Sequence, residues 1–128
     1  MMREILFRGK FGNEWKYGFL SIEPKGLVIK EPYKNESSKV WHIDADTVGQ
    51  YTGMHDKNGT KIFEGDIVKY GDTVHNVVFE QRNGTAYFGL VYSTLETLSF
   101  GYYQDLKQIE VIGNIYDNPE LLKGENND

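Results

Sequence analysis

The sequence predicts a mainly β fold: a small antiparallel barrel-like domain with an N-terminal β layer and a short C-terminal helical turn. The chain has 14 glycines, nine tyrosines and seven phenylalanines in 128 residues, and aromatic residues favour strands while glycines favour turns. Its short apolar runs are separated by turn dipeptides at intervals of about ten residues. Because closure removes exposed strand edges, we expect a closed or nearly closed barrel, with two packed sheets as the alternative.

Turn signals place the hairpins. Phe11–Glu14 is predicted to connect strands at 5–8 and 15–22, and Asp56–Gly59 leads into a strand at 61–63. Arg82-Asn83-Gly84 is the strongest signal, because Asn-Gly supplies the positive φ angles of a tight hairpin. Further strands are expected at 27–30, 39–43, 66–70, 74–80, 86–92 and 109–116.

Two segments are less regular. Residues 95–106 have no clean period and are predicted as a loop or a helical turn. Asn118 and Pro119 suit the N-cap and first position of a short helix. We expect one cooperative domain over residues 1–122, with the N-terminal layer at 1–46 and the barrel core at 47–122, followed by a flexible tail at 123–128.

Composition excludes several classes of function. The chain has no cysteine, so thiol nucleophiles, disulfides and cysteine-ligated metals are ruled out. Its net charge is −5, divided into +1 over residues 1–64 and −6 over residues 65–128, so an anion-binding face is expected in the first half. The N-terminus lacks a signal-peptide pattern and no run is long enough to span a bilayer, so we expect a cytoplasmic protein.

Motifs for catalysis or cofactors are not found in the sequence. G-x-x-x-x-G-K-[ST], G-x-G-x-x-G and G-x-S-x-G do not occur. The run from Asp56 fails as a calcium loop because Lys61 and Ile67 stand where Gly and Glu are needed. The residues His42, Asp44 and Asp46 stand at alternate positions and could ligate a metal from one strand face, but the sequence identifies no further ligand. Glu64 and Asp66 are better explained as part of a turn than as a catalytic acid pair. We therefore expect no cofactor and no metal, and we favour a non-enzymatic role, with an enzyme as the third alternative.

Aromatic residues are too numerous to be entirely interior, so some are expected on the surface. Such a surface serves either protein interfaces or base stacking. Basic residues alternate with aromatic ones in the first half, which keeps single-stranded nucleic-acid binding open as the alternative. The candidate binding residues are Lys10, Lys16, Lys34, Trp41, Tyr51, Tyr102 and Tyr103.

Long stretches of the chain resemble the YopX family of phage and prophage proteins. They are TVGQYTGMHDKNGTKIFEGDIV at 47–68, EVIGNIYDNPELL at 110–122, and REILFRGK with EWKYG near the N-terminus. The resemblance implies a mainly β domain of phage or prophage origin, with no assigned activity and no catalytic positions to carry over. Within these stretches we expect structural roles for Gly49, Gln50, Thr52, Gly53, Asp56, Gly59, Glu64, Gly65, Asp66, Gly113 and Asn114.

The hypothesis that follows is a non-enzymatic accessory protein that binds other protein chains and copies of itself. A phage or host protein is a possible partner, nucleic acid is the less favoured one, and no membrane partner is expected.

Overall fold

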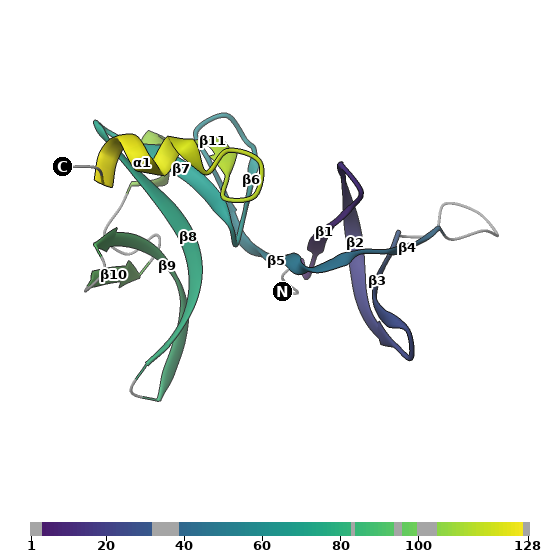
Figure 1. Ribbon diagram of the computed structural model, residues 1–128. Coiled ribbons are helices and arrows are strands. Elements are labelled where there is room, and N and C mark those ends of the chain that lie inside the picture. Colours follow the sequence, from purple (N-terminus) through teal and green to yellow (C-terminus); the bar gives the residue numbers. More distant parts are fainter. Residues whose placement is uncertain (1–3, 32–38, 83, 94–95, 100–104, 127–128) are drawn as a thin grey trace. The chain divides into compact units, whose positions relative to one another are not determined.

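A computed structural model of the protein describes residues 4–31, 39–82, 84–93, 96–99 and 105–126. It confirms the predicted mainly antiparallel β class and the short C-terminal helix (Figure 1). By its contacts the chain separates into two compact units, Met1–Gly53 (unit 1) and Met54–Asp128 (unit 2). The sequence predicts a boundary after residue 46, within the first of these units.

Unit 1 is an antiparallel sheet in the order β4-β3-β2-β1-β5. The short hairpin between β1 and β2 pairs Phe11 with Glu14, and Gly12 provides the positive φ of 63° that this turn needs. Val28, Ile29, Ile43 and Tyr51 are buried. The strands are β1 (Phe7–Phe11), β2 (Glu14–Glu23), β3 (Gly26–Lys30), β4 (Val40–His42) and β5 (Asp44–His55), whose last residues continue into unit 2.

Unit 2 contains a five-stranded antiparallel sheet in the order β10-β9-β8-β7-β11. The first four of these strands form a meander, and β11 returns to pair with β7. The long strand β8 changes its pairing partner along its length: residues up to Asn76 pair with β7, whereas residues from Val77 onward pair with β9. The elements are β6 (Lys61–Phe63), β7 (Asp66–Tyr70), β8 (Thr73–Arg82), β9 (Thr85–Ser93), β10 (Glu96–Ser99), η1 (Leu106–Gln108), β11 (Ile109–Asn114) and α1 (Glu120–Asn126).

The core of unit 2 joins strands that are far apart in the sequence. Its buried side chains come from β6, β7, β8, β9 and β11, and burial of each stabilises the fold by about 1.5–3 kcal/mol. Helix α1 contacts β8 (Figure 1). The members of this core are Ile62, Val68, Val77, Leu90 and Ile109.

Several features differ from the sequence prediction, including the strand β5, which was not predicted. Among the described strands β10 and β11 are the outer strands of their sheet, so the barrel is not closed. The segment 95–106 contains the strand β10, which was not predicted, and the helical turn expected there begins at Leu106. Asn118 uses its side-chain oxygen to accept from the N–H of Asn114 at 3.2 Å instead of capping α1. Helix α1 extends past residue 123, and the mobility of the tail stays a prediction.

Candidate functional site

One face of the unit 1 sheet carries exposed apolar side chains. Paired residues of neighbouring strands share a face and successive residues alternate, so Tyr17, Phe19 and Val40 lie on the same face. Phe19, Lys30 and Val40 form one row across β2, β3 and β4. Tyr17 is 45% exposed, Phe19 57% and Val40 48%. We call the surface made by Tyr17, Phe19, Lys30 and Val40 the Tyr17 face.

Charges of both signs lie on this side of the sheet, where Arg8 also pairs with Tyr17. Lys30 lies between Phe19 and Val40, and its ammonium group is 3.5 Å from a carboxylate oxygen of Glu23. Glu23 follows Phe19 by four residues on β2 and therefore lies on the same face. Both side chains of this pair are about two-fifths exposed, at 42% and 39%. A screened pair of this kind contributes little to folding stability. It does give the surface charges of both signs beside its apolar residues.

The opposite face of the same sheet holds Trp41 in a cluster. The ammonium group of Lys16 lies 3.8 Å from the centre of the Trp41 ring, and the Phe11 ring centre is 5.0 Å away. Two glutamates bind the polar groups of Lys16 and Trp41 in this cluster. Glu14 is 3.1 Å from the ammonium group of Lys16, and Glu31 accepts a 3.0 Å hydrogen bond from the Trp41 indole N–H.

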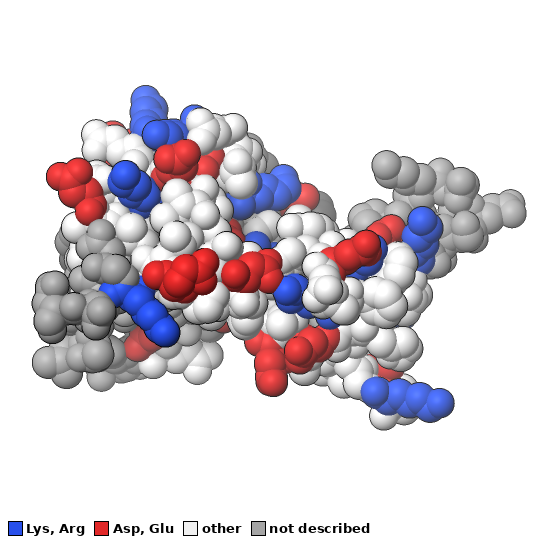
Figure 2. Space-filling view, turned by 45° about the horizontal axis from the view of Figure 1, so that its top comes forward, with Lys and Arg blue, Asp and Glu red and all other residues white. Residues whose placement is uncertain are grey.

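Lys10 and Lys16, both predicted to bind, lie on opposite faces of the sheet. Lys10 pairs with Trp15, while Lys16 pairs with Gly9. Lys10 accordingly lies over the Trp15 ring, 5.6 Å from its centre, together with Arg8 at 4.6 Å. These two lysines therefore do not line one groove. On the face drawn in Figure 2, Lys and Arg side chains are interspersed with Asp and Glu and form no continuous basic stripe.

The remaining predicted binding residues divide into two groups. Tyr51, expected on the surface, is only 4% exposed. The alternation of β5 explains this difference, because Thr47, Gly49 and Tyr51 all face inward. The other three, Lys34, Tyr102 and Tyr103, lie outside the described residues. Phe19 and Val40 were not among the predicted binding residues. The i, i+2 spacing of Tyr17 and Phe19 on a predicted strand indicates that these two side chains share a face, and this signal could have identified Phe19.

Asp56 connects the turn after β5 to β11. Its carboxylate accepts hydrogen bonds from the backbone N–H groups of Asn58 and Thr60 at 2.8 and 2.9 Å, and from Val111 of β11 at 2.9 Å. Burial alone raises the pKa of the Asp56 carboxyl. The hydrogen bonds from Val111, Thr60 and Asn58 and the charge of Lys57 outweigh burial, so the pKa lies below its usual value.

The turn before β7 is built from Glu64, Gly65 and Asp66. Gly65 has a φ of 95°, which suits glycine. Its N–H donates to the carbonyl of Val77 at 2.8 Å, at the point where β8 changes partner. The buried carboxylate of Asp66 accepts from the N–H of Phe63 at 2.7 Å. These contacts fix the chain reversal between β6 and β7, and they give Asp66 a structural role; the role of Glu64 stays a prediction.

Gly113 and Asn114 organise the end of β11. The ladder with β7 shifts register between Val111 and Gly113, and a Cβ on Gly113 would lie 2.6 Å from the side-chain oxygen of Asn118. The Asn114 side-chain oxygen accepts from the N–H groups of Tyr116 and Asp117 at 3.0 and 2.9 Å. The other motif residues are Gly59 with a φ of 81°, Gly53 with a φ of 88°, and Gly49, Gln50 and Thr52 along β5.

Within the described part of the chain, no three His, Asp or Glu side chains are grouped as metal ligands. The same residues include no helix that is both long and apolar enough to cross a membrane.

Comparison with known proteins places the chain in a family. One solved structure, the crystal structure of protein EF1440 from Enterococcus faecalis, is 24% identical, with 94% of this chain and 99% of that chain covered and a TM-score of 0.48. No curated protein matches the chain. The family described as YopX protein matches residues 8–123. Because this match covers nearly the whole chain, the protein belongs to the YopX family.

Proposed function

We propose that this member of the YopX family is a non-enzymatic protein-interaction module that associates with a second copy of itself through the Tyr17 face. The observation that carries the proposal is the concentration of exposed apolar side chains. Among the described residues, six of the seven large hydrophobic side chains that are exposed belong to unit 1, and three of these, Tyr17, Phe19 and Val40, lie together on the Tyr17 face. Aromatic residues in the centre of such a patch contribute most to protein association. The setting we propose is the bacterial cytoplasm, for an accessory protein of phage or prophage origin.

Charge favours a second copy as the occupant. In a two-fold symmetric dimer each patch meets its own image, so a patch of one sign would repel itself. The Tyr17 face carries Lys30 together with Glu23, and each can face the opposite charge of the other protomer. A nucleic-acid strand, the alternative occupant, would have to approach a chain with a net charge of −5, which long-range electrostatics opposes.

Removing the central aromatic tests this proposal. We expect Phe19→Ser to weaken dimerisation by at least about 30-fold, because each substitution removes an anchor from both sides of a symmetric interface. The measurement is light scattering on a size-exclusion column over a range of protein concentrations, with tryptophan fluorescence to check folding.

Ile22→Ser is the matched control. Ile22 is 82% exposed and lies on the same strand, but the alternation places it on the opposite face. We expect this variant to dimerise like the wild type. A wild-type chain that stays monomeric at high concentration, or equal effects of both substitutions, would contradict the proposal.

Single-stranded nucleic-acid binding is the second candidate. Stacked cation and aromatic groups, Lys16 with Trp41 and Arg8 with Trp15, support it. Glu14 and Glu31 oppose it, because they already engage the ammonium group of Lys16 and the indole of Trp41. A fluorescent oligothymidylate titrated at low salt separates the candidates. Salt-sensitive binding that Trp41→Ala abolishes would favour nucleic acid over self-association.

A further inference from the structure

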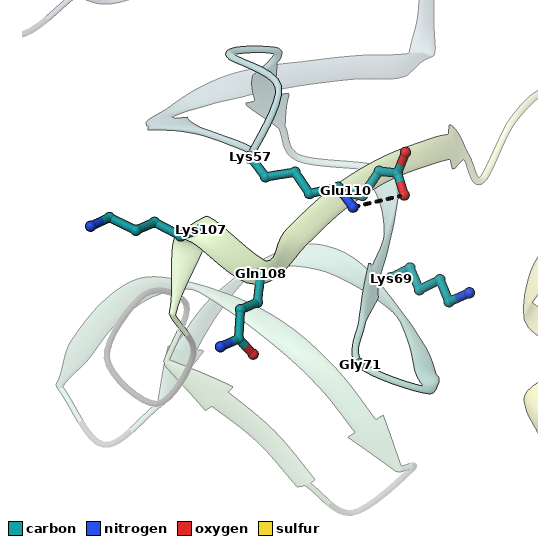
Figure 3. Close-up of a pocket in the computed structure, with 6 residues that line it drawn as sticks. All are labelled: Lys57, Lys69, Gly71, Lys107, Gln108 and Glu110. Atoms are coloured by element: carbon teal, nitrogen blue, oxygen red, sulfur yellow. Dashed lines mark ion pairs between the residues drawn. The ribbon is translucent and has the colours of Figure 1, made fainter.

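A polar pocket opens on unit 2. Its volume is about 430 Å³, within the range of sites for small ligands. Its described lining has no aromatic or aliphatic side chain, which makes it unsuited to an apolar ligand. The lining residues are Lys57, Lys69, Gly71, Lys107, Gln108 and Glu110 (Figure 3).

Backbone pairing holds the walls of the pocket in place. Lys69 of β7 stands directly opposite Glu110 of β11 in the antiparallel ladder. The N–H of Lys57 donates to the carbonyl of Ile109 at 2.9 Å, which ties the turn after β5 to β11. The N–H of Lys107 donates to the carboxylate of Asp105 at 3.0 Å, at the start of η1. The lysine side chains are flexible, but the backbone positions from which they extend are set by the fold.

The charge of the pocket runs against that of its surroundings. Residues 65–128 contain only four basic residues and carry a net charge of −6. Two of those four, Lys69 and Lys107, line this pocket together with Lys57. Among the described lining residues Glu110 supplies the single carboxylate, 3.6 Å from the ammonium group of Lys57. Both side chains of that pair are about two-fifths exposed, so the pair is weak and Lys57 can exchange Glu110 for a ligand oxygen.

The spread of the ammonium groups selects the kind of anion. Figure 3 shows Lys57 directed toward Glu110, whereas the side chains of Lys69 and Lys107 extend away from each other at the two sides of the pocket. These three lysines come from three separate segments, and their flexible side chains can turn toward a ligand that lies between them. An anion with several charged groups along its length can bridge them, and flexible lysines bind phosphate oxygens as point charges.

We propose that this pocket binds a small polyanion that carries two or more linked phosphate groups. Phosphate oxygens contact Lys69 and Lys107 at the two sides, the middle of the ligand displaces Glu110 from Lys57, and the Gln108 amide is available as a further donor. This site needs no second copy of the chain and goes beyond the function proposed above.

The test uses the full chain and inorganic tripolyphosphate, titrated by calorimetry at low and moderate salt. We expect salt-sensitive binding that the double variant Lys69→Gln/Lys107→Gln weakens by about tenfold, the sum of two screened contacts. Glu110→Gln should strengthen binding about threefold, because it removes the carboxylate that competes for Lys57. In backbone NMR spectra, the shifts on binding should centre on residues 57, 69–71 and 107–110.

The matched control is Lys25→Gln/Lys123→Gln, which removes the same charge at exposed positions outside the lining. It should bind like the wild type. Equal weakening by both double variants, or no binding of tripolyphosphate, overturns the proposal. A short oligonucleotide of the same total charge forms the second arm. If it binds more tightly than tripolyphosphate and depends on the same lysines, the phosphate groups come from nucleic acid; the reverse order identifies a small ligand.

Discussion

Asp56→Ala is expected to lower the free energy of unfolding of unit 2 by about 3 kcal/mol. The substitution leaves three backbone N–H groups, those of Asn58, Thr60 and Val111, without their acceptor. Hydrogen bonds to a charged acceptor contribute about 1.5–3 kcal/mol each, and water replaces part of this at the exposed turn. Val111 belongs to β11, so the loss also weakens the attachment of the turn to the sheet. Urea unfolding followed by circular dichroism measures the change.

The contribution of Asp56 should depend on pH in a defined direction. Its folded-state pKa is lowered, so its stabilising effect is complete above the ordinary carboxyl range near pH 4 and is lost as the pH falls through the folded-state pKa. The difference between wild type and Asp56→Ala should therefore be constant from pH 7 to about pH 5 and shrink below about pH 4. Asp72→Ala, at an exposed turn of the same unit, is the control and should cost less than about 0.5 kcal/mol. A difference that persists unchanged in strong acid would contradict this account.

Gly18→Ala is expected to destabilise unit 1 by about 3 kcal/mol. A Cβ at this buried position would lie 2.2 Å from the carbonyl oxygen of Lys30 and 2.9 Å from its carbonyl carbon. These are backbone atoms of the neighbouring strand, so a side-chain rotation cannot relieve the overlap and the two strands must separate. Both tryptophans, Trp15 and Trp41, lie in unit 1. Their fluorescence during urea unfolding therefore reports on this unit.

Gly12→Ala is the matched control for the backbone. Gly12 has a φ of 63° and nothing within 4 Å of an added Cβ, so the cost is only that of a left-handed alanine, about 1 kcal/mol. Equal losses for the two variants would show that the close approach at Gly18 is unimportant. Because Gly18 lies between Tyr17 and Phe19, its substitution should also disrupt self-association, whereas Gly12→Ala should leave it intact.

The two proposals fail independently. Self-association depends on the Tyr17 face in unit 1, and polyanion binding depends on lysines in unit 2. A monomeric chain that still binds tripolyphosphate would remove only the first proposal. A dimer that is indifferent to tripolyphosphate would remove only the second.

Local turn chemistry was the most predictable part of the fold. Gly12, Gly59 and Gly84 all have positive φ, at turns that the sequence indicates through Gly-Asn or Asn-Gly. The strand Asp66–Tyr70 was predicted with its observed bounds because its turn and its apolar run are both local signals. Strand β5 was not predicted, because glycines such as Gly49 and Gly53 locally favour turns over strands, yet both lie within its run of 12 residues. Its pairing with β1 overrides that local preference.

The candidate surface was predictable only in part. Composition indicated exposed aromatic residues, but the faces depend on the hairpin between β1 and β2. Because Phe11 pairs with Glu14, an even-numbered residue of β1 shares its face with an odd-numbered residue of β2. Lys10 therefore joins Trp15, and Lys16 lies on the other side. A turn one residue longer would have placed both lysines on one face.

The sequence by itself determined the β class, the positions of most turns and the family, because each rests on residues that are close together or on long continuous motifs. The tertiary structure alone decided which side chains meet. The lysine pocket shows why: Lys57, Lys69 and Lys107 are separated by up to 50 residues and come together through the pairing of β7 with β11 and the hydrogen bond from Lys57 to Ile109. The uneven charge of the two halves predicted an anion-binding face only in the first half. Instead, non-local strand register, which no short stretch encodes, brings Lys69 and Lys107 of the second half together with Lys57.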